Sequence, residues 1–217
     1  MTQTSLRIGS TVPNFDADTT QGQINFHSFL NNKWTVFFSH PADFTPVCTT
    51  ELSEVAKLTP EFTKRNVQLI GLSCDDLESH QKWLKDVEEY GKTKVTYPLI
   101  ADTDRKVATL FDMLDEQDLT NVDAKGLPLT VRSVFFIDTK KVIRAIITYP
   151  ASVGRNAKEL LRVIDSFLQS EKFACATPVD WKSGDKVIIP PTVKTEEALK
   201  KYKNVQTVKP YLRFADA

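Results

Sequence analysis

WTVFFS (residues 34–39) and HPADFTPVCTTE (residues 40–51) follow one another directly in this chain, and together they decide its fold. The first run is short and rich in aromatic and β-branched residues, which predicts a buried strand. Pro46 suits the first turn of a helix, where its missing N–H costs nothing. The segment is therefore predicted to pass from a strand through a stiff connection into a helix, with Cys48 in the first helical turn.

Cys48 is the candidate nucleophile because of this position. The thiolate is the reactive form, and a free cysteine, with a pKa of about 8.5, is only slightly ionised at neutral pH. The positive end of a helix stabilises an anion by about 1 to 2 kcal/mol. A reactive thiolate also needs a nearby cation. Arg132, at the edge of an apolar run, is the best candidate for that cation.

Glu51 lies three residues after Cys48, on the same face of the predicted helix. An unpaired carboxylate there would oppose the formation of a thiolate. The site works only if an arginine neutralises Glu51. Arg155, at the start of a predicted helix, is the candidate.

Apolar runs alternate with amphipathic stretches along the rest of the chain. Further strands are predicted at residues 67–73, 133–138 and 142–148, the last two as a hairpin. Helices are predicted at residues 48–58, 77–90, 105–113 and 156–169. Pro60 is expected to end or kink the first of these helices. Strands interleaved with helices predict an α/β layer fold.

The composition changes after about residue 173. Residues 177–209 are rich in Pro, Lys, Thr and Val, with one short helical pattern at residues 195–202. We therefore expect two domains, residues 1–172 and a small C-terminal module of extended segments at residues 173–217.

The whole-chain numbers exclude several classes of protein. Lys+Arg and Asp+Glu are both 28 in 217 residues, so no basic excess points to a nucleic-acid partner. No run approaches the roughly 20 apolar residues that span a bilayer, so no membrane association is expected. The N-terminus lacks the apolar core of a signal peptide, which predicts a cytoplasmic location. Three cysteines, an odd number, argue against a disulfide framework.

The string PADFTPVCTTE resembles the active-site signature of the peroxiredoxins, Pro-x-x-x-Thr-x-x-Cys. With TPVDW at residues 177–181, the chain is most similar to the one-cysteine (peroxiredoxin-6 type) subfamily, from about Gly9 to Phe214. The resemblance implies a thioredoxin-like fold with a C-terminal extension. It also implies a thiol peroxidase that reduces hydrogen peroxide and organic hydroperoxides through a Cys48 sulfenic acid, in antioxidant defence.

The resemblance further implies roles for residues at matching positions. Cys48 would be the nucleophile, Thr45 would hydrogen-bond the thiolate and the peroxide, and Pro41 would shield the pocket from water. Arg132 would stabilise the thiolate and the transition state.

Three supporting residues complete the implied site. Glu51 and Arg155 would orient Arg132, and His40 would lie close to the sulfur. No metal, haem or flavin is expected. An external reductant is required, and glutathione, thioredoxin and ascorbate all remain open. A homodimer is implied.

Other interpretations assign different roles to the remaining candidates. Cys175 lies two residues before the position of a resolving cysteine, so a two-cysteine mechanism stays open, as does a sensor that passes oxidation to a partner. Cys74 is expected to be a structural core residue. The three histidines lack metal-ligand spacing, and His80 is expected on a solvated helix face. Lys33 replaces the serine of a phospholipase site credited to some members of the subfamily.

Overall fold

The run at residues 34–39 forms β3 (Trp34–Ser39), a strand in which every residue is buried. It pairs in parallel with β4 (Val67–Ser73) and antiparallel with β6 (Arg132–Ile137). In this register Phe37 lies between Ile70 and Phe135. Apolar residues on both faces explain why the pattern is continuous instead of alternating.

The computed structural model describes residues 6–217, and in this part of the chain β3 and β4 lie inside a seven-stranded mixed sheet. The strand order is β2-β1-β5-β4-β3-β6-β7. The remaining strands are β1 (Asp16–Thr19), β2 (Gly22–Asn25), β5 (Leu99–Ala101) and β7 (Ile143–Tyr149). The cytoplasmic location was predicted from the N-terminal sequence, and residues 1–5 of that sequence lie outside the described residues.

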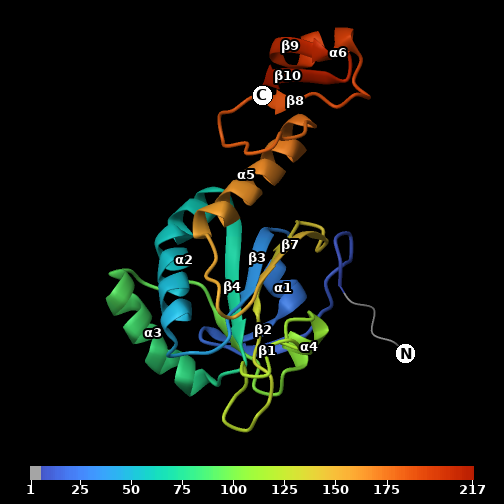
Figure 1. Ribbon diagram of the computed structural model, residues 1–217. Coiled ribbons are helices and arrows are strands. Elements are labelled where there is room, and N and C mark those ends of the chain that lie inside the picture. Colours follow the sequence, from blue (N-terminus) through green and yellow to red (C-terminus); the bar gives the residue numbers. More distant parts are fainter. Residues whose placement is uncertain (1–5) are drawn as a thin grey trace, which may run out of the picture. The chain divides into compact units, whose positions relative to one another are not determined.

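Helices cover both faces of this sheet (Figure 1). α2 (Pro46–Lys64) and α3 (Leu77–Gly91) lie together on one face, while α1 (Phe26–Leu30) and α4 (Lys106–Leu110) lie on the other. On the α1 side Phe26, Phe37 and Phe111 pack edge to face or tilted. Together these layers make the predicted thioredoxin-like α/β fold.

The predicted strands and the hairpin of β6 and β7 are confirmed, but some helix limits differ. α2 does not end at Pro60 but continues to Lys64. Its buried face includes Leu52, Val55 and Phe62, and this packing outweighs the single backbone hydrogen bond that a proline removes. α4 is shorter than the predicted helix at residues 105–113, mainly because it ends at Leu110, where Phe111 is the C-cap and the next residue, Asp112, has φ +54°.

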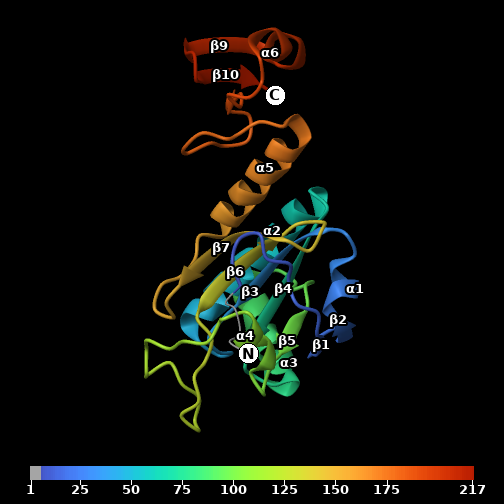
Figure 2. The same cartoon turned by 90° about the vertical axis from the view of Figure 1, so that its right-hand side faces the viewer.

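The chain divides into two compact units, the first ending at Ala157 and the second formed by Lys158–Ala217. The second unit contains nearly all of α5 (Ala157–Phe173), which is longer than predicted. It also contains β8 (Val187–Ile188), α6 (Thr195–Lys201), β9 (Lys203–Lys209) and β10 (Leu212–Asp216). Its three strands form a separate sheet in the order β8-β10-β9, of which β9 and β10 are labelled in Figure 2.

Candidate active site

Cys48 lies in the first turn of α2 and is completely buried. Thr45 is the N-cap in an extended conformation, and Pro46 is the first helical residue, as predicted. No acidic residue occupies the first turn. The free N–H groups and the dipole at this helix end therefore favour a negative charge on the sulfur.

Arg132 places a cation directly beside the sulfur. Its Nη1 atom lies 3.3 Å from Cys48 Sγ. Its Nε and Nη2 atoms donate to the Ala151 carbonyl, at 2.9 Å and 2.6 Å. The side chain of Arg132 is only 3% exposed, so little water screens its charge.

Glu51 is neutralised by two arginines. One carboxylate oxygen accepts from Arg132 Nη1 and Arg155 Nη2, both at 2.8 Å. The other accepts from the side chain and the backbone N–H of Arg155. Burial alone would raise the pKa of Glu51, but Arg155 and then Arg132 outweigh it and hold this pKa below its usual value. Two cations and one anion leave a net positive charge beside Cys48.

Arg155 also ties the site to the sheet. Its Nη1 atom donates to the Ser39 carbonyl at the end of β3 and to the Ser133 carbonyl in β6. The guanidinium lies 5.4 Å from the centroid of the Phe38 ring. These contacts fix the carboxylate of Glu51, and therefore Arg132, to the central strands.

The two remaining residues of the signature have different surroundings. Pro41 is buried, directly after the end of β3. The Thr45 hydroxyl donates to the Ala42 carbonyl at 2.8 Å. Within residues 6–217 no hydrogen bond joins this hydroxyl to Cys48, although its lone pairs remain available as acceptors.

The histidines differ most from the predictions. The expectation that His80 lies on a solvated helix face is wrong, because its side chain is completely buried. The buried face of α3 includes His80, Trp83 and Val87, which are spaced at i, i+3 and i+7. This helical spacing is the signal in the sequence that could have predicted a buried histidine. His40 is also buried, and its imidazole contacts Asp43, which the sequence analysis did not select.

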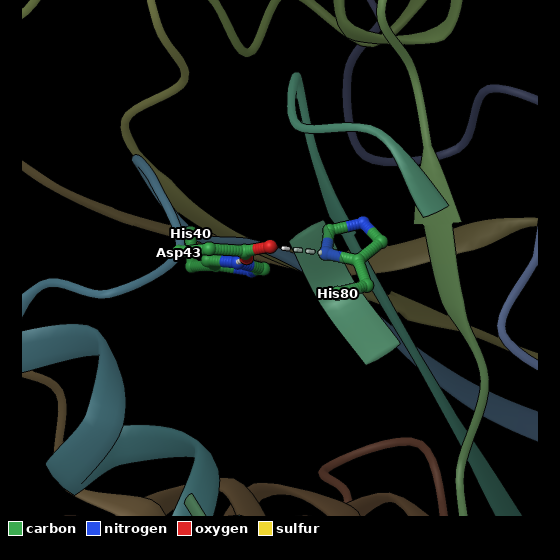
Figure 3. A group of neighbouring side chains, drawn as sticks. All are labelled: His40, Asp43 and His80. Carbon is green, nitrogen blue, oxygen red and sulfur yellow. Dashed lines mark hydrogen bonds and ion pairs between the residues drawn. The ribbon is translucent and has the colours of Figure 1, made fainter. Parts of the chain in front are cut away.

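His40, Asp43 and His80 come together as a cluster although the sequence showed no ligand spacing (Figure 3). They are the one group in the described part of the chain with a ligand set suited to a metal ion, since their donor atoms lie within 4.8 Å of one another. Asp43 lies 3.0 Å from His40 and 2.8 Å from His80. These are the distances of direct hydrogen bonds.

The other two cysteines are buried in different places. Cys74 follows β4, and burial raises the pKa of its thiol to about 12. Cys175 belongs to the second unit, where its sulfur lies 3.6 Å from the Gln169 carbonyl. Burial also raises the pKa of the Cys175 thiol. Both thiols are therefore poor nucleophiles at neutral pH in this structure.

A search of the helices in residues 6–217 finds none whose length and hydropathy would allow it to cross a bilayer.

Comparison with protein families matches residues 8–146 to the AhpC/TSA family and residues 170–204 to the C-terminal domain of 1-Cys peroxiredoxin. The yeast Saccharomyces cerevisiae protein "Peroxiredoxin PRX1, mitochondrial" is 56% identical over 98% of this chain and 81% of its own length. Human peroxiredoxin-6 is 47% identical over 96% of each chain.

Solved structures agree with the sequence relatives. Peroxiredoxin 6 of Arenicola marina superposes with a TM-score of 0.92 at 42% identity, covering 98% of both chains. The yeast mitochondrial 1-Cys peroxiredoxin superposes with a TM-score of 0.88 at 53% identity, covering 98% of this chain and 100% of the other.

One prediction is corrected by these relatives. The cytoplasmic location inferred from the N-terminal sequence is contradicted, since the yeast relative at 56% identity is named a mitochondrial protein. A signal-peptide pattern concerns only one route of targeting, so its absence could not establish a compartment.

The fold, the buried cysteine at a helix N-terminus with its arginine, and the two family matches agree. This chain belongs to the AhpC/TSA family, as a thiol peroxidase of the one-cysteine peroxiredoxin type.

Proposed function

We propose that Cys48 is the residue that reacts with hydrogen peroxide and small organic hydroperoxides. The observation that carries this assignment is the 3.3 Å contact between its sulfur and the buried guanidinium of Arg132. The thiolate attacks the terminal oxygen of ROOH, the O–O bond breaks, and the terminal oxygen stays on sulfur with its proton as Cys48–SOH. The leaving RO⁻ takes up a proton and departs as an alcohol or water.

Five residues assist this step in the proposed mechanism. Arg132 stabilises the negative charge that moves from sulfur to the leaving oxygen, and this stabilisation is greatest where it accelerates the reaction. Glu51 and Arg155 hold Arg132 in place. Thr45 turns its hydroxyl from the Ala42 carbonyl toward the peroxide, and Pro41 excludes water.

The sulfenic acid must then be reduced by an external thiol, and we propose glutathione or thioredoxin for this chain. Support comes from the yeast mitochondrial 1-Cys peroxiredoxin, whose solved structure is described as the basis of its thiol resolving mechanism via glutathione/thioredoxin systems. The proposed cycle requires no metal, haem or flavin and no nucleic acid.

A homodimer and a domain boundary near residue 172 also belong to this proposal. The match of residues 170–204 to the C-terminal domain of 1-Cys peroxiredoxin supports the boundary. Light scattering of the purified chain tests the dimer.

The test of the peroxidase assignment is stopped-flow mixing of the reduced protein with hydrogen peroxide, followed by intact-mass analysis. We expect a fast reaction that adds one oxygen atom and is lost in Cys48→Ser. A product with a Cys48–Cys175 disulfide would replace the one-cysteine mechanism by a two-cysteine one. An unchanged rate in Cys48→Ser would refute the assignment.

A further inference from the structure

Ser39 is the last residue of β3 and is completely buried. Its hydroxyl donates to the Val131 carbonyl at 2.6 Å and accepts from the Ser133 N–H at 3.1 Å. These two backbone groups belong to the peptide units on either side of Arg132, the residue whose guanidinium contacts the sulfur. One oxygen atom therefore holds the backbone of Arg132 from both sides.

The backbone of Ser39 departs from the regular ladder between β3 and β6. The paired register ends with Phe38 opposite Val134, so Ser39 and Ser133 are the next residues on the two strands. The carbonyls of both serines accept from the same atom, Arg155 Nη1, at 2.9 Å and 3.2 Å. The carbonyl of Ser39 thus serves Arg155, and its hydroxyl supplies the acceptor for the N–H of Ser133.

The hydroxyl of Ser39 is separated from the reacting atoms. Side chains alternate along β3, which places Ser39 on the face of Phe37, the α1 side of the sheet. Cys48 lies on the other side, in α2. The single hydroxyl proton of Ser39 is already donated to Val131, so none remains for the sulfur. Ser39 can therefore influence the reaction only through the arginines that it holds.

The position of the Arg132 backbone matters because its guanidinium contacts three groups at once. Nη1 lies 3.3 Å from Cys48 Sγ and 2.8 Å from Glu51, while Nε and Nη2 both donate to the Ala151 carbonyl. A shift of the Arg132 backbone would break some of these contacts or lengthen the one to the sulfur. Donors stabilise a developing charge best when supporting residues fix their geometry in advance.

We propose that Ser39 is a positioning residue of the peroxidase reaction, whose hydroxyl fixes the backbone of Arg132 and whose carbonyl fixes Arg155. Both arginines bind Glu51, so one buried serine supports the whole cationic side of the site. The role rests on the reaction proposed above for Cys48 and Arg132. The hydrogen bonds that define it can be measured without peroxide.

A purely structural role is the alternative. In that case the hydroxyl of Ser39 only satisfies backbone groups where the ladder ends, and its loss removes a partner from a buried carbonyl and a buried N–H. The stability of the fold would then fall, whereas Cys48 in the folded protein would react at an unchanged rate. The two roles therefore differ in whether Ser39 affects the rate, and in whether that effect depends on Arg132.

The first test is a double-mutant cycle on the rate constant for oxidation of Cys48 by hydrogen peroxide, with Ser39→Ala, Arg132→Met and the variant that carries both changes. Ser39→Ala should lower the rate constant about 10-fold, since a misplacement of about 1 Å can cost up to about 100-fold. In the Arg132→Met background the same change should have less than about a twofold effect, because the group that Ser39 positions is absent.

Ser53→Ala is the matched control for this cycle. Ser53 is an equally buried serine, but it lies in α2 and its hydroxyl donates to the Thr50 carbonyl at 2.9 Å. The variant should react at the native rate. The positioning role would be overturned by equal rate losses in Ser53→Ala and Ser39→Ala, or by a loss from Ser39→Ala that is the same with and without Arg132.

The second test measures the hydrogen bonds of Ser39 by NMR in the reduced protein. In the native chain its hydroxyl proton should exchange slowly with water and show a nuclear Overhauser effect to the amide proton of Ser133. In Ser39→Ala the Ser133 amide should exchange at least about 10-fold faster, while that of Phe135, inside the ladder of β3 and β6, keeps its rate. A hydroxyl proton in fast exchange, or an unchanged Ser133 amide, would contradict the inference.

These tests distinguish failure of the inference from failure of the proposed function. A slow Arg132→Met together with a Ser39→Ala that reacts at the native rate would leave the proposed function intact and overturn the role of Ser39 alone. An Arg132→Met that reacts at the native rate would refute the role of Arg132 and, with it, that of Ser39. The measurement of the Ser39 hydroxyl proton uses the native chain, so it applies even if Ser39→Ala does not fold.

Discussion

The Nη1 atom of Arg132 lies 3.3 Å from the sulfur of Cys48, although 84 residues separate them in the chain. The same nitrogen donates to Glu51 at 2.8 Å, so one guanidinium joins the sulfur of Cys48 to a buried carboxylate. The sheet produces this contact because Arg132 opens β6, which pairs with β3, and β3 leads into the segment that carries Cys48.

Replacing Arg132 tests the cation at the sulfur. Arg132→Met should lower the rate constant for oxidation of Cys48 by hydrogen peroxide about 100- to 1000-fold, the usual effect of removing one donor to a developing charge. Stopped-flow fluorescence measures this rate. Arg144→Met is the matched control, because Arg144 is a half-exposed arginine on the neighbouring strand β7. Similar losses in both variants would contradict a local role for Arg132.

Replacing Glu51 tests the buried charge network. Glu51→Gln leaves Arg132 and Arg155 without their counter-ion, and should lower the free energy of unfolding by about 3 to 5 kcal/mol. Urea denaturation measures the loss. Glu54→Gln, three residues further along α2 at a side chain that is 55% exposed, should change the free energy of unfolding by less than about 1 kcal/mol. Equal effects would mean that burial of Glu51 is unimportant.

Acid should destabilise the fold through the same carboxylates. Glu51 and Asp43 have pKa values lowered in the folded chain, so the stability they contribute is present above their unfolded values and is lost as the pH falls through the folded ones. The midpoint of urea unfolding should decrease below about pH 4.5, the unfolded range of these groups. In Glu51→Gln the urea midpoint should decrease less steeply with falling pH than in the native protein. The same steepness in both proteins would show that Glu51 does not contribute to the acid destabilisation.

A rise in pH should remove the stability that protonated His80 contributes to the cluster. The pKa of His80 is raised in the folded chain, so its contribution is complete below the unfolded value of about 6.5 and is lost as the pH rises through the folded one. The free energy of unfolding in urea should decrease as the pH rises above about 6.5, and His80→Gln should abolish this decrease. His27→Gln, at a partly buried histidine on α1, is the control that should retain it.

The other two cysteines should be dispensable for one round of oxidation. Cys74→Ser and Cys175→Ser are expected to react with peroxide at the native rate, because burial raises the pKa of both thiols. Intact-mass and peptide analysis should place the added oxygen on Cys48 in each variant. Oxygen found mainly on Cys74 would contradict the assignment of the nucleophile.

The strand, turn and helix of residues 34–58 could be predicted because their signals are local. An apolar run of β-branched and aromatic residues favours a strand, and Pro46 marks the first turn of a helix. The position of Cys48 at the positive end of that helix follows from these neighbours. The helix does not end at Pro60 because the packing of α2 acts over many residues and overrides a local preference.

The sequence by itself thus determined the α/β class and the position of Cys48 in the first turn of a helix, and it predicted a cation beside the sulfur and a neutralised Glu51. Only the tertiary structure decided that the buried His80 meets Asp43, which lies 37 positions earlier in the segment before Cys48. The reason is physical: backbone propensities depend on neighbouring residues, whereas the protonation of a buried imidazole depends on groups that only the folded chain brings within hydrogen-bonding distance.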